Sequence, residues 1–166
     1  TITSPATVRS GQSITFTATP KTGYIVEGWY TDAACTAGKH DAGSTAYTTS
    51  IIGETNVYVK FVEKNWSVAF EAGIGGSITT PSSTPQAVGQ LTGIDIAATP
   101  ATGYTFKQWD ITNGSGSFTS AATTNNNHFK PTADSKVTAS FTETMSTLTT
   151  SNQYNAGDPG YAIPTK

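Results

Sequence analysis

Hydrophobic and polar residues alternate along several short stretches of this chain. Residues 12–19 place isoleucine, phenylalanine and alanine between hydroxyl-bearing residues, and residues 65–70 place tryptophan, valine and phenylalanine between polar or small residues. A period of two is the pattern of a β-strand that buries one face. No window of about 11 residues shows a convincing period of 3.6, so the pattern predicts a mainly β protein with little or no helix.

The strand pattern occurs twice at a fixed distance. The segment TPKTGYIVEGW at residues 19–29 returns as TPATGYTFKQW at residues 99–109, an offset of 80 residues. The same offset relates two further pairs of blocks, residues 14–18 with 94–98 and residues 57–63 with 137–143. Three separated blocks with one offset indicate an internal duplication, which predicts two tandem modules. Modules of this size fold alone, but only marginally.

Prolines and glycines mark the ends of the predicted strands. Pro20 and Pro100 end one strand in each module, since proline cannot donate to a sheet ladder. An irregularity near Gly28 would turn Trp29 inward against strict alternation. Long loops are expected at about residues 31–46 and 111–127. A strand remnant is predicted at residues 1–8, ending near Pro5. The other predicted strands are residues 12–19, 24–29 and 57–62, and then residues 65–70, 77–80, 93–99, 104–109 and 137–142.

The repeat also sets the expected domain boundaries. We expect a first module at residues 1–63, a second at 64–143, and a tail at 144–166 that is a linker or an added strand. The first module has no copy of the strand at 65–70, so either it lacks that strand or another segment fills its place. Because the linker between the modules is short, we expect limited bending and an elongated rod. The chain begins at Thr1 without a methionine, and we interpret it as a piece of a longer protein.

Composition narrows the class of protein. Charged residues are 12% of the chain and the net charge is −2, with no basic cluster, so no nucleic-acid partner is expected. No apolar run approaches the ~18 residues of a membrane span, so no membrane insertion is expected. The single cysteine, Cys35, cannot form an internal disulfide. Low charge with abundant threonine, serine, asparagine and glycine suits an extracellular bacterial β protein at the cell surface.

The repeated residues resemble a known family. The segment GYIVEGWYTDAACT at residues 23–36, followed by NVYVKF at 56–61, resembles the Listeria–Bacteroides repeat of the internalin B-repeat type. The second module is similar to its divergent relatives through the segments GSIT, AATPATGYTFKQW and VTASF at residues 76–79, 97–109 and 137–141. It departs after Trp109, where DITNG replaces the YTD of the first module. The resemblance implies small β-grasp-like, or else β-sandwich-like, modules strung in tandem on bacterial surface proteins.

Candidate catalytic and metal-binding residues are few. The two histidines, His40 and His128, are expected in exposed loops, because no partners converge on them in the sequence. The acidic pairs Asp32/Asp41 and Glu63/Glu71 carry no signature of a glycosidase. Residues 110–115 fail the EF-hand pattern, which requires glycine at the sixth position. We therefore predict no enzyme, no cofactor and no metal site.

Aromatic residues fall into two predicted groups. Those at matching positions in both modules are expected in the core, because small modules with few leucines must bury their rings: Tyr24, Trp29, Phe61, Tyr104, Trp109 and Phe141. Those without a repeat counterpart are candidates for an exposed binding surface: Tyr30, Tyr47, Phe118, Tyr154 and Tyr161.

Two functional hypotheses follow. The first is a non-enzymatic spacer or adhesion region whose partners are neighbouring repeats of the parent chain and a host or cell-surface protein or glycan. The alternative is a carbohydrate-binding accessory module of a secreted polysaccharide-degrading enzyme, which requires a planar strip of exposed aromatic rings.

Overall fold

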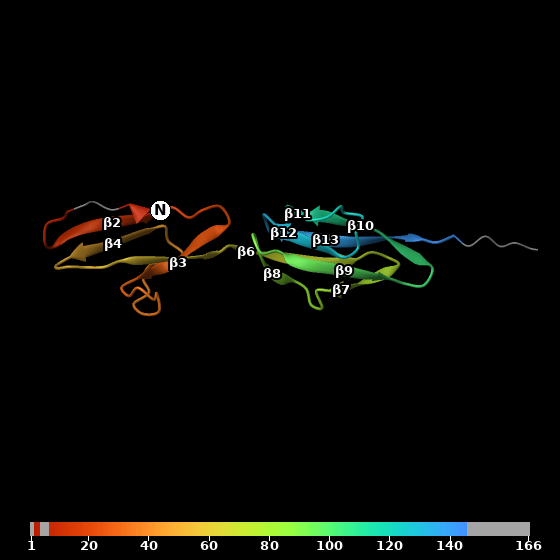
Figure 1. Ribbon diagram of the computed structural model, residues 1–166, viewed down its shortest axis with the longest axis horizontal. Coiled ribbons are helices and arrows are strands. Elements are labelled where there is room, and N and C mark those ends of the chain that lie inside the picture. The colour runs from red at the N-terminus through yellow and green to blue at the C-terminus, as the bar shows by residue number, and fades with distance from the viewer. Residues whose placement is uncertain (1, 4–6, 146–166) are drawn as a thin grey trace, which may run out of the picture.

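The computed structural model describes residues 2–3 and 7–145, and these form two β modules that lie end to end along the long axis (Figure 1). Within these residues every regular element is a strand and no helix occurs, as the periodicity predicted. None of the described residues belongs to a helix long and apolar enough to cross a membrane. The predicted tail lies outside the described residues from 146 onward.

The first module contains two small sheets. One has the strand order β1-β2-β4 and the other pairs β3 with β5. The buried centre is Ala18, Val26 and Trp29, with Phe16 and Tyr47 packed against it from the first sheet. The strands of this module are β1 (Ile2–Thr3), β2 (Gln12–Ala18), β3 (Tyr24–Tyr30), β4 (Ala46–Ile51) and β5 (Tyr58–Glu63).

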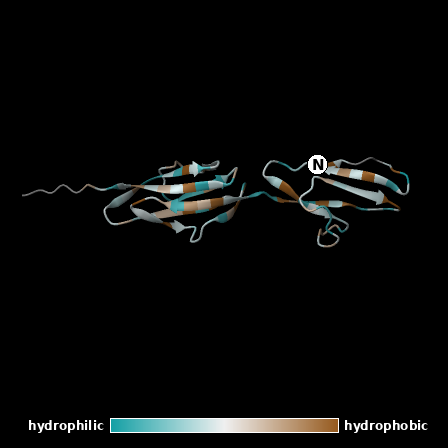
Figure 2. Cartoon of the chain, turned by 180° about the vertical axis from the view of Figure 1, so that it is seen from behind, coloured by the Kyte–Doolittle hydropathy of each residue, from teal (hydrophilic) through white to brown (hydrophobic). Residues whose placement is uncertain are grey.

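The second module is a sandwich of two four-stranded sheets, with strand orders β10-β13-β6-β8 and β11-β12-β9-β7. Hydrophobic residues recur along its strands (Figure 2). The core between the sheets is larger than in the first module: Val68, Phe70, Val88, Ile96, Ala98, Trp109, Phe129, Val137 and Ala139. Its strands are β6 (Asn65–Ala72), β7 (Gly76–Thr80), β8 (Gln86–Gly89), β9 (Ile94–Pro100), β10 (Tyr104–Asn113), β11 (Gly116–Phe118), β12 (Asn127–Pro131) and β13 (Ser135–Glu143).

A bulge at the same place in both modules turns the tryptophans inward. The pairing of β3 with β5 shifts register between Val26 and Gly28, and the pairing of β10 with β13 shifts between Phe106 and Gln108, 80 residues later. The extra residue breaks strict alternation. Trp29 and Trp109 are consequently buried, with 0% and 1% of their surface exposed. The irregularity expected near Gly28 is therefore confirmed.

Four strands escape the sequence prediction: β4, β8, β11 and β12. The loop expected at residues 111–127 was too long, because β10 continues to Asn113 and β11 pairs with β12. These strands are short and carry few large apolar residues, so their period-2 signal is weak. They form because a neighbouring strand supplies their hydrogen-bond partners.

Candidate functional site at the joint between the modules

The two modules meet where β5 passes almost directly into β6, with Lys64 as the only residue between the strands. The backbone N–H of Lys64 donates to the carbonyl of Gly23 in the first module at 2.8 Å. The carbonyl of Lys64 accepts from the N–H of Gln90 in the second module at 2.9 Å. This residue is thus bonded through its backbone to both modules, which restricts its φ and ψ.

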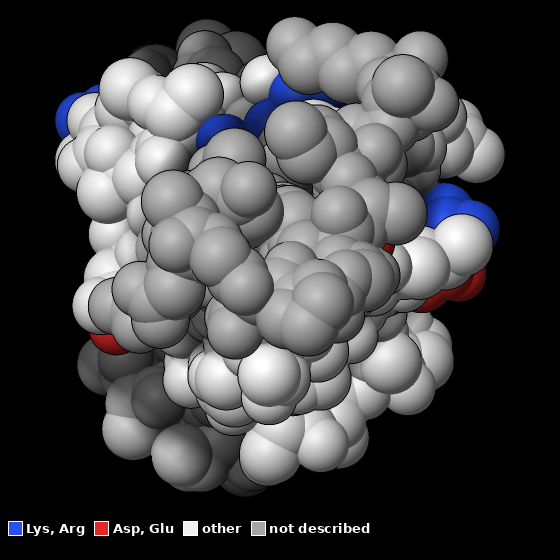
Figure 3. Space-filling view, turned by 90° about the vertical axis from the view of Figure 1, so that its right-hand side faces the viewer, with Lys and Arg blue, Asp and Glu red and all other residues white. Residues whose placement is uncertain are grey.

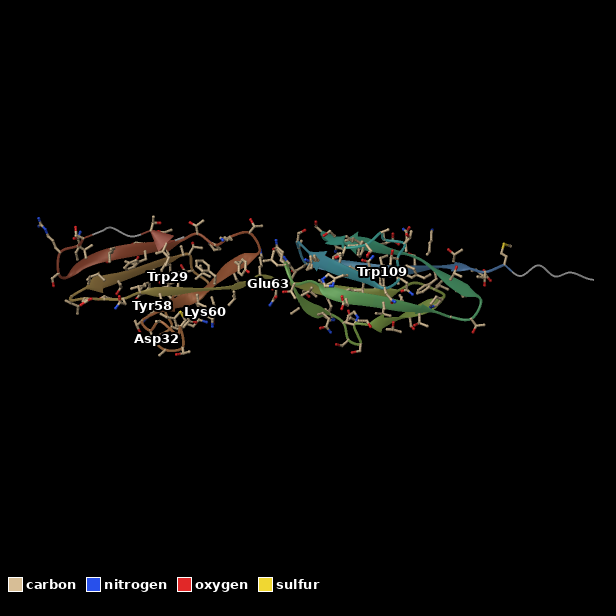
Figure 4. All side chains as sticks on the ribbon, in the orientation of Figure 1. Trp29, Asp32, Tyr58, Lys60, Glu63 and Trp109 are labelled. Atoms are coloured by element: carbon tan, nitrogen blue, oxygen red, sulfur yellow. The ribbon has the colours of Figure 1, made fainter. Side chains whose placement is uncertain are left out.

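The side chain of Glu63 ties the first module to a loop of the second (Figure 4). Its Oε1 accepts the N–H groups of Leu91 at 2.5 Å and Thr92 at 2.6 Å, and its Oε2 accepts the hydroxyl of Thr92 at 2.5 Å. Hydrogen bonds to an ionised acceptor are stronger than neutral ones. The Thr92 hydroxyl and then the N–H groups of this loop lower the pKa of Glu63. The bonds therefore hold at neutral pH and weaken as pH falls below the usual glutamate range.

Two glycines allow the close approach at the joint. A Cβ added to Gly89 would lie 2.5 Å from Oε1 of Glu63, so a side chain there would displace the carboxylate. A Cβ added to Gly23 would lie 2.8 Å from the side chain of Leu91. Gly103, the repeat counterpart of Gly23, has nothing within 4 Å of the same position. The crowding at Gly23 is thus a property of the joint and not of the turn.

The side chains of Lys64 and Trp66 make further contacts at the joint. The ammonium of Lys64 lies 3.9 Å from the centre of the Trp66 ring, within the range of a cation–π interaction. The indole N–H of Trp66 donates to Oε1 of Gln90 at 3.2 Å. Side chains and backbone of the linker therefore all have partners in the modules.

A second cluster of charged groups lies on the first module beside its long loop. The carboxylate of Glu27 forms ion pairs with Lys60 at 2.9 Å and Lys39 at 3.1 Å. Lys60 and then Lys39 lower the pKa of Glu27 from 4.5 to about 2. Burial, and then the Glu27 carboxylate, raise the pKa of Tyr30. Near the start of the loop, the carboxylate of Asp32 accepts the N–H groups of two residues that follow it, which lowers its own pKa.

The Glu27 cluster predicts a specific acid sensitivity of the first module. Because the folded-state pKa of Glu27 is depressed, its contribution to stability is complete above pH 4.5 and is lost as pH falls toward 2. Glu27→Gln should therefore lower the urea midpoint of the first module at pH 7. At pH 2 the difference in midpoint between the variant and the wild type should be smaller. An equal difference between the two proteins at both pH values would contradict this assignment.

The histidines lie in different surroundings. His40 is exposed in the loop, as expected, and its ring stacks on Tyr47 at 5.3 Å. His128, expected in an exposed loop without partners, instead belongs to β12. Its Nδ1 lies 2.6 Å from Asp95, and its Nε2 lies 2.8 Å from the carbonyl of Thr92. Pairing of β12 with β9 places His128 opposite Asp95, which linear sequence does not show.

Among residues 2–3 and 7–145 no group of three or more His, Cys, Asp or Glu side chains could hold a metal ion. The carboxylate of Asp110 accepts hydrogen bonds from the side-chain amide of Gln108 and from the hydroxyl of Ser140. Where described residues are visible at this end of the molecule, Figure 3 shows both basic and acidic side chains among uncharged ones.

Comparison with known proteins identifies the repeat. The sequence pattern of the divergent InlB B-repeat domain matches residues 1–65 and again residues 66–145. The chain belongs to the divergent InlB B-repeat family. Domains of this family are non-catalytic and are typical of the repeat regions of bacterial surface proteins. No curated protein and no solved structure matches the chain.

The tryptophans of the two InlB B-repeats have equivalent surroundings. The indole N–H of Trp29 donates to the carbonyl of Ser44 at 2.9 Å, and that of Trp109 donates to the carbonyl of Asn125 at 2.8 Å. Each ring therefore fills the core and also anchors the loop that follows its strand. Phe61, Tyr104 and Phe141, also expected in the core, are half-buried.

Tyr24 corrects the prediction for the matching aromatic positions. It is 41% exposed, whereas its counterpart Tyr104 is half-buried. The difference arises because the turn between β6 and β7 covers Tyr104: a Cβ added to Gly75 would overlap that ring. No described residue of the first module forms an equivalent turn over Tyr24.

The three candidate exposed aromatics that the structure describes, Tyr30, Tyr47 and Phe118, do not form an exposed platform in the InlB B-repeats. Tyr30 is only 3% exposed, which corrects the expected exposed position. The same bulge that buries Trp29 ends the alternation before Tyr30, and both residues are buried. Tyr47 is half-buried and stacks 5.9 Å from Trp29, and Phe118 is half-buried 5.3 Å from Phe129. Tyr154 and Tyr161 lie outside the described residues.

Glu63 is the residue of the joint whose contacts the sequence did not reveal. Its position in the short linker indicated limited bending, but no motif shows that its carboxylate bonds to residues 91 and 92. The sequence contains the carboxylate of Glu63 and the glycines at 23 and 89, but it does not show that they lie close together. Their proximity is visible only in the folded structure.

Proposed function

We propose that this chain is a non-enzymatic spacer and interaction region outside a bacterial cell, in which successive repeats are held in line. The observation that carries the proposal is the bonding of Glu63 to Leu91 and Thr92. A flexible linker would leave the modules free to rotate, whereas these bonds and those of Lys64 restrain the angle between them. A restrained joint keeps a binding surface at a fixed distance from its anchor.

The far end of the second module supports the same reading. The N–H of Thr144 donates to the carbonyl of Gly103 at 2.7 Å, as Lys64 donates to Gly23 at the joint. Glu143 is the counterpart of Glu63, and it is exposed. A further repeat placed after Glu143 would find the same carboxylate and the same turn. Neighbouring repeats are therefore the first partners that we propose.

The acidic side chains support a non-enzymatic role. Glu63 is bonded within the joint, and Glu71 forms an ion pair with Lys136 at 2.8 Å. Asp32 accepts hydrogen bonds within its own loop. A glycosidase needs two carboxyl groups that face a substrate across a cleft. These carboxylates are instead engaged with the protein that surrounds them.

The joint can be tested with a matched pair of variants. Glu63→Ala removes the acceptor for Leu91 and Thr92, so we expect faster independent tumbling of the modules and a broader set of shapes. Glu143→Ala removes the repeat counterpart of Glu63, which is exposed and does not bond to the loop at residues 91 and 92. This substitution should leave the tumbling of the modules and the set of shapes unchanged. Nuclear spin relaxation and small-angle scattering of the full chain measure them.

Three outcomes of that test would count against the proposal. The first is a compact scattering profile for the wild type. The second is an equal response to both substitutions. The third is independent tumbling of the modules in the unaltered protein.

A further inference from the structure

The ring of His128 lies between two groups that accept hydrogen bonds. Its Nδ1 is 2.6 Å from Oδ1 of Asp95, and its Nε2 is 2.8 Å from the carbonyl oxygen of Thr92. Neither a carbonyl nor an ionised carboxylate has a proton to donate. A neutral imidazole donates from one nitrogen, whereas the imidazolium donates from both. Both acceptors are therefore satisfied only when the ring is charged.

Loss of a proton from the ring would release Thr92 and keep the bond to Asp95. A hydrogen bond to a carboxylate is stronger than one to a neutral carbonyl, so the remaining proton stays on Nδ1. The carbonyl of Thr92 then faces the lone pair of Nε2. The ring is packed closely against this loop, because a Cβ added to Gly93 would overlap Nε2. The loop must then move away from the neutral ring.

Thr92 is also the residue of the second module that holds Glu63. Its N–H donates to Glu63 at 2.6 Å and its hydroxyl donates at 2.5 Å, while its carbonyl faces His128. The strands β8 and β12, on either side of this loop, lie at the end of the second module that faces the first (Figure 1). A change at the histidine is therefore passed to the joint through one residue.

The first module has an uncharged pair at the equivalent position. Thr15 of β2 lies opposite Thr48 of β4, as Asp95 of β9 lies opposite His128 of β12, 80 residues later. The hydroxyls of the two threonines are 2.8 Å apart. The fold of the repeat thus forms with or without a charged pair at this position.

Other charged groups near the ring are few. Lys130 follows on β12, and its side chain and the His128 ring both border the position of a Cβ added to Gly93. The Thr92 hydroxyl is the largest cause of the lowered pKa of Glu63, and Lys130 is a smaller one. The carboxylates of Asp95 and Glu63 favour a charged ring, and Lys130 opposes it. The sequences of β8, β11 and residues 119–126 contain no ionisable side chain, and Asp95 is the only one in β9.

We propose that the pair of Asp95 and His128 is a pH-dependent contact that restrains the joint when the ring is protonated and loosens it when the ring is neutral. The inference rests on the restrained joint of the proposed function. Histidine is the side chain whose charge ordinarily changes between about pH 5 and 8. Glu63 remains ionised over this range, because its pKa is lowered from 4.5. The joint is then most restrained in mildly acidic solution and looser in mildly alkaline solution.

The test compares the full 166-residue chain at about pH 5.5 and about pH 8, which lie on either side of the ordinary histidine range. Nitrogen chemical shifts of the His128 ring should show two protonated nitrogens at the lower pH and only Nδ1 protonated at the higher. Protection of the Thr92 N–H from hydrogen exchange, corrected for the intrinsic rate, should fall about 2- to 10-fold, as for the loss of one hydrogen bond. Spin relaxation should show more independent tumbling of the modules at the higher pH.

Three variants identify the group that responds. Asp95→Thr combined with His128→Thr installs the pair of the first module, so the second module should fold and the joint should be loose at both pH values. His128→Gln alone does not titrate and should also remove the pH response. His40→Asn removes the other histidine of the chain, which lies in the loop of the first module, and should leave the response unchanged.

The possible outcomes distinguish this inference from the spacer role on which it rests. Equal restraint of the joint at both pH values in the wild type would overturn the inference and leave the spacer role standing. Independent tumbling of the modules at both pH values would overturn both. A pH response that persists in either His128 variant, or that disappears in His40→Asn, would assign the response to another group and overturn the inference.

Discussion

Trp29→Ala is expected to unfold the first module and to leave the second folded. The indole is fully buried and is the largest side chain of a small core. Truncation of a buried tryptophan costs about 3–5 kcal/mol through lost burial and a residual cavity. Small domains have total stabilities of about the same size. The loss of the bond from the indole to Ser44 also releases the long loop.

Trp109→Ala is the matched variant for this prediction. Its ring is equally buried, but it belongs to a core closed by two complete sheets, so a similar cost is a smaller fraction of the total. Calorimetry should show an earlier first transition, or its disappearance, for Trp29→Ala. It should show a lowered second transition for Trp109→Ala. Unchanged melting of either variant would place the altered ring outside its core, contrary to the structure.

Gly114→Ala is expected to destabilise the second module strongly. Gly114 has φ = +78°, and an added Cβ would overlap the carbonyl of Asp134 and lie 2.7 Å from Cα of Ser135. Both obstacles are backbone atoms, which cannot rotate away as a side chain does. A left-handed backbone costs a non-glycine residue about 1–2 kcal/mol, and overpacking adds about 1–3 kcal/mol. The expected total is about 2–5 kcal/mol.

Gly103→Ala separates these two contributions. Gly103 has φ = +84°, and nothing lies within 4 Å of its added Cβ, so only the backbone cost of about 1–2 kcal/mol applies. Chemical denaturation of both variants measures the difference. If the two substitutions lowered stability equally, the overlap of the added Cβ at residue 114 with the backbone of residues 134 and 135 would not contribute to the loss of stability.

The repeat made much of the fold predictable, because the same physical pattern occurs twice. Trp29 and Trp109 could be assigned to a core since few other large apolar residues were available. The bulge near Gly28 was also readable, since glycine in a strand often marks one. Strands that alternate threonine with apolar residues, such as β2 and β9, gave a clear period of two.

The rest depended on contacts that sequence spacing does not show. The side-chain amide of Asn125 accepts the N–H of Ala98 at 2.9 Å and donates to its carbonyl at 2.7 Å. It thus makes the two backbone hydrogen bonds that a neighbouring strand would otherwise make. Asn127 is buried, and its side chain bonds to Ser120 and Ala121. Both residues looked like ordinary loop asparagines. Their role depends on which strand lies opposite them.

The candidate site was less predictable than the fold for the same reason. The short linker indicated a restrained joint, but Glu63 acts on a loop 28 residues further on. The burial of Tyr30 depends on the bulge in the pairing of β3 with β5. Long-range partners decide both cases, and a single sequence contains no record of them.

The parallel pairing of β6 with β13 has a mechanical consequence. β6 begins at the joint, and β13 ends at the opposite end of the module, so tension along the chain pulls these neighbours in opposite directions (Figure 1). The hydrogen bonds between them are then sheared together and are not opened one after another. A module built in this way resists stretching until the whole set of bonds breaks at once.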